Sequence, residues 1–179
     1  MKKSKDEYLM LREEILHLDS IINNTINFFY AFVATIITFS ITQDDSMFVL
    51  ISYIVIIPAY LMVLSKEIGI FKIAAYLHVF LEGEEFNWER RNRKLYSNDS
   101  APILYKIQSF NFPFLFVSTF VTIIFCIKTE WNNICSTYES IKIFIAIGLY
   151  IIQLVLIIKN RRVSAKPYRE LWDKVKKEE

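Results

Sequence analysis

The stretch SIINNTINFFYAFVATIITFSITQDDSMFVLISYIVIIPAYLMVLS, residues 20–65, decides the fold of this chain. It contains two uncharged runs, 20–43 and 46–65, separated only by Asp44 and Asp45. A bilayer core of about 30 Å requires roughly 20 residues of apolar helix, each rising about 1.5 Å. Both runs are long enough, and so short a connection permits only an antiparallel pair. The sequence therefore predicts a transmembrane hairpin with an acidic tip.

Two further uncharged runs, 107–127 and 143–158, predict two more spans. The last has only 16 residues, and it crosses the bilayer only if Lys142 and Lys159 extend their ammonium groups to the two interfaces. A signal peptide is not expected, because the first apolar run is too long and follows a charged segment of 19 residues. The predicted fold class is an all-α polytopic membrane protein with four transmembrane helices.

Basic residues are distributed very unevenly among the segments between the runs. Of the 21 Lys and Arg, 4 precede the first run, 7 lie between the second and third, and 8 follow the fourth. Only Lys128 and Lys142 lie elsewhere. Cytoplasmic connections carry an excess of Lys and Arg, so we expect both termini and the long middle segment in the cytoplasm. Aromatic anchors agree with this: Trp131 and Tyr138 in the outer connection, and Tyr30, Tyr60 and Phe110 towards the inner side.

Helical spacing continues the first two spans beyond the membrane as long helices. One heptad register joins Tyr8, Leu11, Ile15, Leu18, Ile22, Thr25, Phe29, Phe32, Ile36 and Phe39. It predicts one helix from about Lys5 to Ile41, whose seam packs on the chain's own second helix or on another subunit. After Ser65, an amphipathic pattern predicts a second extension ending at Gly83: Ile70, Ile73, Ala74, Leu77, Phe80 and Leu81.

These patterns divide the chain into five segments. We expect a cytoplasmic N-terminal helix (1–19), a transmembrane hairpin (20–65), a cytoplasmic helical segment (66–106), transmembrane spans three and four (107–158), and a basic cytoplasmic tail (159–179).

Catalytic motifs are lacking in the sequence, so we do not expect an enzyme. It contains no Gly-x-Ser-x-Gly, no phosphate-binding glycine loop and no Cys-x-x-Cys. His78 and Glu82 are four residues apart, but a metal site needs further ligands, and we expect neither metal nor cofactor. Cys126 and Cys135 could pair in an oxidising exterior, although two thiols are the simpler expectation.

The spans contain neutral polar residues but no charges, which argues against transport coupled to intramembrane carboxylates. Ser118, Thr119, Thr122 and Gln153 lie on spans three and four. The first span carries a stripe of candidate pore-lining residues: Asn23, Asn24, Asn27, Thr35, Thr38 and Thr42. Either these hydroxyls bond to their own helix and the small residues allow close packing, or the stripe lines a neutral pathway at the centre of an oligomer.

Two further groups of residues are candidates for binding. The middle segment offers a polar surface with two aromatic anchors for a soluble partner: Phe86, Trp88, Glu89, Arg90, Arg91 and Arg93. The exit from the last span carries basic residues that attract anionic lipids: Lys159, Arg161, Arg162, Lys166 and Arg169. Both groups are explained without a nucleic-acid partner. Beyond them, Leu171, Trp172 and Val175 would face either the membrane surface or the helix bundle.

Three short runs resemble a pattern of small bacterial membrane proteins: residues 8–16 (YLMLREEIL), 75–82 (AYLHVFLE) and 86–90 (FNWER). Some proteins of this kind resemble the membrane subunits of anti-phage defence systems of the Kiwa and Hailong types. The resemblance implies a bacterial inner-membrane location and a soluble partner that senses infection or makes a signal. It supplies no catalytic residue.

The sequence thus leaves two hypotheses open. One is an oligomeric membrane effector or ion channel, a tetramer by preference, gated by its cytoplasmic helices. The other is a non-conducting sensor or scaffold that docks a soluble protein partner.

Overall fold

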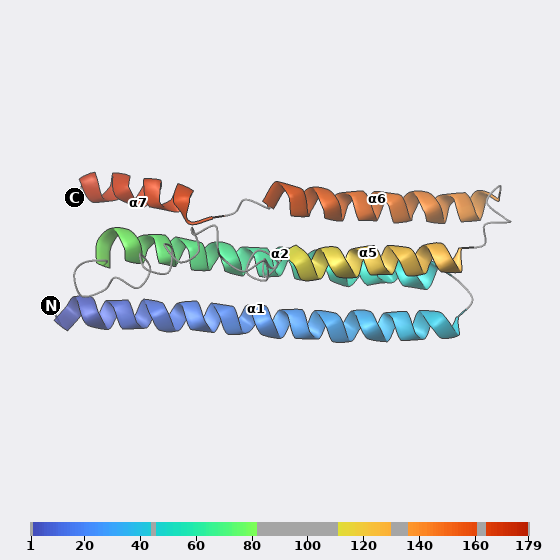
Figure 1. Cartoon of the computed structure of the whole chain (residues 1–179), viewed down its shortest axis with the longest axis horizontal. Coiled ribbons are helices and arrows are strands. Elements are labelled where there is room, and N and C mark those ends of the chain that lie inside the picture. The colour runs from blue at the N-terminus through green and yellow to red at the C-terminus, as the bar shows by residue number, and fades with distance from the viewer. Residues whose placement is uncertain (1, 44–45, 82–110, 130–135, 161–163, 179) are drawn as a thin grey trace, which may run out of the picture. The chain divides into compact units, whose positions relative to one another are not determined.

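The computed structural model describes residues 2–43, 46–81, 111–129, 136–160 and 164–178. Regular structure within these ranges is entirely helical, which confirms the all-α class (Figure 1). The elements are α1 (Lys2–Thr42), α2 (Met47–Tyr76), the π-helical turn η1 (Leu77–Leu81), α5 (Asn111–Lys128), α6 (Thr137–Asn160) and α7 (Lys166–Glu178). Four helices, namely α1, α2 with its η1 turn, α5 and α6, are long and apolar enough to cross a membrane. The chain is therefore a multi-pass membrane protein.

The first two helices are as long as their patterns predict. α1 runs without a break for 41 residues, and it includes the whole of the predicted helix from Lys5 to Ile41. α2 continues for 30 residues through Pro58, and η1 extends it to Leu81. The predicted end at Gly83 lies outside the described residues.

The fourth span is longer than its uncharged run. α6 has 24 residues because it begins at Thr137, where Ser136 accepts a hydrogen bond from the backbone N–H of Glu139 at 3.3 Å. The side chain of Lys142 is buried, with Nζ 2.5 Å from Glu139 Oε1 and 4.5 Å from the centroid of the Tyr138 ring. The charge is thus neutralised inside the protein, and the added turns supply the missing length.

Contacts divide the chain into two units, which we describe separately. The membrane unit comprises Asn24–Val63 and Phe110–Arg162, and the extramembrane unit comprises Met1–Asn23, Leu64–Ser109 and Val163–Glu179.

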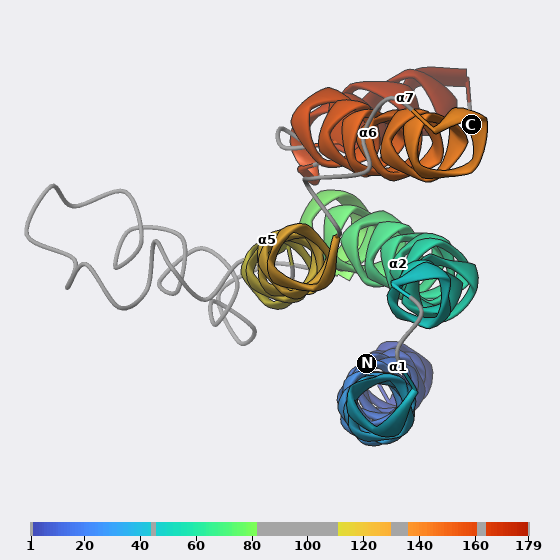
Figure 2. The same ribbon diagram turned by 90° about the vertical axis from the view of Figure 1, so that its right-hand side faces the viewer.

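In the membrane unit, α2 is the central helix. Residues spaced three or four apart along it are essentially inaccessible: Val49, Tyr53, Ile56, Tyr60 and Val63. In the most apolar stretch of each helix, 44% of the α2 residues are buried, against 17% of the α1 residues. Figure 2 views the helices end-on and shows α1 at one edge and α6 at the other, with α2 and α5 side by side between them. One face of α1 therefore packs on the bundle and most of the helix surface does not.

Candidate functional site

The exposed side of α1 carries all six predicted pore-lining residues. Within the membrane unit, the buried side of α1 consists of Phe29, Val33 and Ser40. At about 100° per residue, Ala31 and Thr38 lie almost opposite these buried positions. The exposed face, which we call the polar stripe, includes Asn23, Asn24, Asn27, Ala31, Thr35, Thr38 and Thr42.

Hydroxyl groups in the polar stripe bond to their own helix. Thr35 Oγ1 donates to the Ala31 carbonyl and Thr38 Oγ1 to the Ala34 carbonyl, both at 2.8 Å. Thr42 Oγ1 donates to the Phe39 carbonyl at 2.7 Å. These bonds satisfy the donors, so each threonine presents its methyl group and oxygen lone pairs outward. No such local bond is shown for Asn27, and a side-chain amide facing hydrocarbon is costly. The polar stripe therefore favours contact with another helix or with water over contact with lipid.

A second polar cluster lies inside the membrane unit, between α2 and α5. The Tyr53 hydroxyl is 3.1 Å from the Ser118 carbonyl oxygen and 2.8 Å from Thr122 Oγ1. Ser118 Oγ donates to the Phe114 carbonyl at 2.7 Å. Beside this cluster, Thr119 Oγ1 lies 3.3 Å from the Tyr150 hydroxyl and links α5 to α6. The bonds of Tyr53 and Tyr150 link α2, α5 and α6 within the apolar spans, where hydrocarbon offers few other hydrogen-bond partners.

Tyr60 joins the same three helices nearer the other end of α5. It is wholly buried, and its hydroxyl lies 3.0 Å from Asn111 Oδ1 and 3.2 Å from the Leu156 carbonyl oxygen. Sequence analysis assigns Tyr60 to an interface anchor, whereas the structure makes it a core residue. Gln153 is also wholly buried, and neither end of its amide makes a hydrogen bond to the described residues.

Sequence reasoning identified the polar residues of α5 and Gln153 but missed the tyrosines that bond to the α5 residues. Tyr53 and Tyr150 lie within the spans rather than at their ends. A tyrosine hydroxyl at such a depth needs a hydrogen-bond partner, and this requirement could have pointed to both tyrosines from the sequence.

The end of α1 is held by a lysine from another helix. Lys128, in the last turn of α5, donates through Nζ to the carbonyl of Ser40 and, at 2.6 Å, to that of Gln43. The last carbonyls of a helix lack intrahelical partners, and a cation there also complements the helix dipole. Lys128 and Lys142, the two exceptions to the charge bias, thus both have partners within the chain.

Lys128→Met should destabilise the membrane unit by about 1–3 kcal/mol, because two carbonyls lose a charged donor. Hydrogen exchange should accelerate in the last turn of α1, and the thermal midpoint in detergent should fall. Lys159→Met is the matched control, since Lys159 is exposed at the end of α6 and should change neither quantity. Equal effects of the two substitutions would contradict a capping role.

In the extramembrane unit, α7 docks on the end of α2 through an aromatic cluster. The Trp172 ring meets those of Tyr76 and Phe80 edge-on, with centroids 5.3 Å and 6.1 Å away. Trp172 Nε1 donates to the Lys72 carbonyl at 3.3 Å. The Tyr76 hydroxyl donates to Glu7 Oε1 of α1 at 2.7 Å. Three chain segments thus meet at Tyr76, and Trp172 faces the bundle, whereas Leu171 and Val175 are exposed.

The π-helical turn takes part in this docking. Lys176 Nζ donates to the Val79 carbonyl at 2.5 Å and lies 5.6 Å from the centroid of Phe80. Single π-helical turns are uncommon and are often found at functional positions. The contact makes α7 sensitive to the conformation of the α2 terminus.

Glu67 is a half-buried carboxylate two residues beyond the apolar run that ends at Ser65. Its Oε2 has no hydrogen-bond partner among the described residues. Burial raises the pKa of Glu67 from its ordinary 4.5 to about 7.

A raised pKa in the folded state means that folding stability falls as pH rises from about 4.5 to about 7. Glu67→Gln removes this penalty and should add about 1 kcal/mol at pH 8, after allowance for partial exposure. The thermal midpoint in detergent should therefore rise by about 2–4 °C at pH 8 and hardly change at pH 4. An equal gain at both pH values would show that titration of Glu67 is not the cause.

The remaining predicted sites are only partly described. All six candidate partner-binding residues, Phe86, Trp88, Glu89, Arg90, Arg91 and Arg93, lie outside the described residues. So do Arg161 and Arg162 of the lipid-binding group, Trp131 and Phe110 among the aromatic anchors, and Cys135. Lys159 and Lys166 are exposed, and Arg169 is half-buried on α7. Within the described ranges, no three His, Cys, Asp or Glu residues gather as a metal site would require.

Comparison with known proteins found no family model, no curated protein and no solved structure that matches the chain.

Proposed function

We propose that this protein is an oligomeric membrane effector that conducts ions along the polar stripe of α1 and is gated by its extramembrane helices. The observation that carries the proposal is the position of the stripe. It lies on the helix with the least buried membrane span, opposite the face that packs on the bundle. Copies arranged around an axis would cover Asn27, Thr35 and Thr38 and bring them together, with Asn23 and Asn24 at the mouth of the pathway.

Gating by the extramembrane unit is supported by continuity of the chain. α1 and α2 pass from one unit into the other without a break, and α7 rests on the end of α2. A ligand or soluble partner that displaces α7 would act directly on a helix that forms the core of the membrane unit.

The cellular setting that we propose follows from the sequence alone. The charge bias favours cytoplasmic termini, and the resemblance to membrane subunits of anti-phage defence systems favours a bacterial inner membrane and a soluble partner protein. Anionic lipids would bind the exposed Lys159 and Lys166.

A non-conducting sensor or scaffold is the second candidate, and the local hydrogen bonds of Thr35, Thr38 and Thr42 favour it. Such bonds are common where helices pack closely. In this alternative the stripe holds copies together and conducts nothing.

Planar-bilayer recording distinguishes the two candidates. The purified protein, alone and with extract from phage-infected bacteria, should show discrete currents under at least one condition. Native mass spectrometry of the same sample should show a small closed oligomer, for which a tetramer is our expectation. Oligomers without current under either condition would favour the scaffold, and a monomer at all concentrations would overturn the channel.

A further inference from the structure

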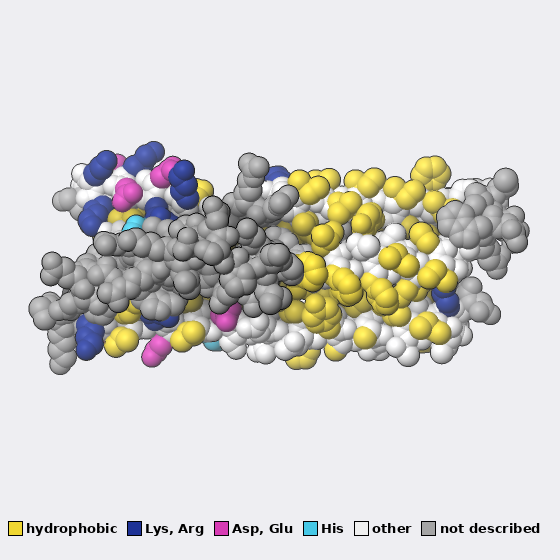
Figure 3. Space-filling model, in the orientation of Figure 1, with side chains coloured by type: hydrophobic (Ala, Val, Ile, Leu, Met, Phe, Trp, Pro, Cys, Tyr) yellow, Lys and Arg dark blue, Asp and Glu magenta, His cyan; other side chains and the backbone are white. Residues whose placement is uncertain are grey.

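An aromatic ridge runs along the outer face of α5. Phe112, Phe116 and Phe120 stack at successive turns, with centroid distances of 6.3 Å and 6.4 Å. All three are about half exposed and lie opposite the buried face that contains Phe114 and Val121. Figure 3 has the orientation of Figure 1, in which α5 lies in front of α2. It shows hydrophobic side chains gathered on this side of the membrane unit.

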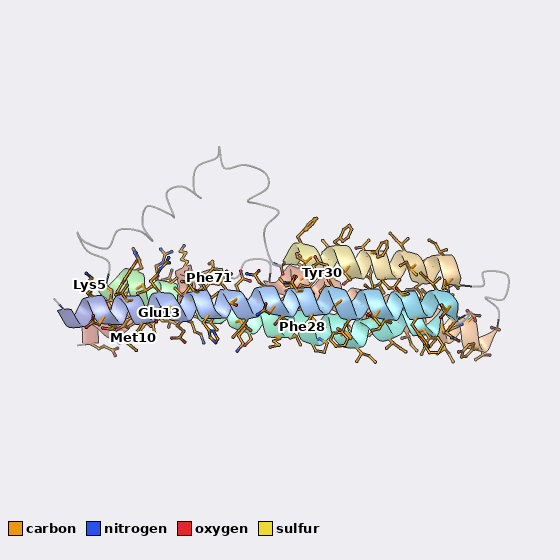
Figure 4. The ribbon with its side chains drawn as sticks, turned by 90° about the horizontal axis from the view of Figure 1, so that it is seen from below. Lys5, Met10, Glu13, Phe28, Tyr30 and Phe71 are labelled. Atoms are coloured by element: carbon orange, nitrogen blue, oxygen red, sulfur yellow. The ribbon has the colours of Figure 1, made fainter. Side chains whose placement is uncertain are left out.

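An apolar groove lies between α1 and α2. It has a volume of about 390 Å³, and its walls include Phe28 and Phe32 of α1 and Val55, Pro58 and Met62 of α2. In Figure 4, Phe28 and Tyr30 point to opposite sides of α1, with α2 on the Phe28 side and α5 on the Tyr30 side. The groove and the aromatic ridge therefore lie on opposite flanks of the membrane unit.

Contacts between helices show that the aromatic ridge and the groove lie at the same depth. The Phe29 and Phe114 rings are 4.7 Å apart, and Lys128 binds the Gln43 carbonyl. In both pairs the residue of α5 comes 85 positions after that of α1, so the two helices run parallel with a constant offset. Phe112 and Phe116 are accordingly level with residues 27 and 31, within the part of α1 that forms the groove. Rotation about an axis normal to the membrane keeps every residue at its own depth, so only features at equal depth meet between copies.

We infer that the aromatic ridge of one copy inserts into the groove of the next. This inference rests on the proposed oligomeric function and names its subunit contact. A ridge and a groove on opposite flanks make a head-to-tail contact, which closes into a ring when the rotation permits. The polar stripe points in a third direction, away from α2, and therefore faces the centre of such a ring. Stacked rings held in one orientation lose little side-chain entropy on binding, as expected of an interface anchor.

Photo-crosslinking tests this contact in the intact protein. The benzophenone analogue of phenylalanine, placed at Phe116, should crosslink to a second copy within residues 25–32 or 55–62, as read by mass spectrometry of digested dimers. The matched control is the same analogue at Ile152 of α6. Thr119 is level with Tyr150, and Asn111 is level with Leu156, so Ile152 lies at nearly the same depth as Phe116. Because Ile152 is exposed on α6, the analogue there should yield lipid adducts.

Filling the groove gives an independent measurement. Ala59→Trp should raise the dissociation concentration of the oligomer about tenfold, whereas Ile152→Trp should leave it unchanged. Circular dichroism checks that each variant keeps its helices. Oligomers with no crosslink from position 116 to another copy, or with only lipid adducts there, would overturn this contact and leave the proposed oligomer standing. A wild-type protein that is monomeric would remove both.

Discussion

Thr38→Leu is expected to lower ion conductance by about tenfold or more while leaving the oligomer intact. Thr38 is exposed in the single chain, and its hydroxyl bonds only to the Ala34 carbonyl of its own helix. Leucine at this position therefore breaks no contact between helices. In a narrow pathway lined by oxygen atoms, however, a ring of leucine side chains favours dewetting and blocks ions.

Thr38→Ser is the matched control, because it keeps the oxygen and should retain most of the current. A cysteine at Thr38, in a background with Cys126 and Cys135 replaced by serine, should react with a water-soluble thiol reagent when the protein conducts. Cysteines at Phe32 and Phe39 should not react. Full activity of Thr38→Leu, or an inert cysteine at Thr38 in the active state, would show that the stripe is a packing surface.

Trp172→Ala is expected to release α7 from the extramembrane unit. The substitution removes two edge-on ring contacts and the bond to the Lys72 carbonyl. For a half-buried tryptophan this costs about 2 kcal/mol, somewhat less than the loss of a fully buried one. A helix of 13 residues is marginal on its own in water, so an undocked α7 should unfold.

Hydrogen exchange across residues 166–178 should then accelerate by about thirtyfold, with little change in α5 and α6. Leu171→Ala is the matched control, because Leu171 is adjacent and 57% exposed. Under the proposed function, Trp172→Ala also changes the probability of opening and leaves the unitary current unaltered. Unchanged exchange in α7 would mean that its other contacts suffice to hold it.

Sequence by itself determined the number and order of the four apolar helices and the length of the first. The length of an uncharged run is a one-dimensional property, and hydrocarbon forces each such run into a helix because it offers no other partner for the backbone. The extension of α1 was also readable, since its heptad register continues from the span into the charged segment. Even the polar stripe could be located, because a few neutral residues stand out in an apolar helix.

Only the tertiary structure decided which faces meet and which polar groups find partners. α2 is apolar on nearly all sides, so no period in its sequence marks the buried face that carries Tyr53 and Tyr60. The capping of α1 by Lys128 joins residues 85 and 88 positions apart, and the docking of Trp172 on the Lys72 carbonyl spans 100 positions. Such pairs leave no local pattern, because the free energy that selects them comes from packing between helices. The buried Lys142 shows the same limit: its charge ends the uncharged run, but its ion pair with the buried Glu139 lies inside α6, which begins at Thr137.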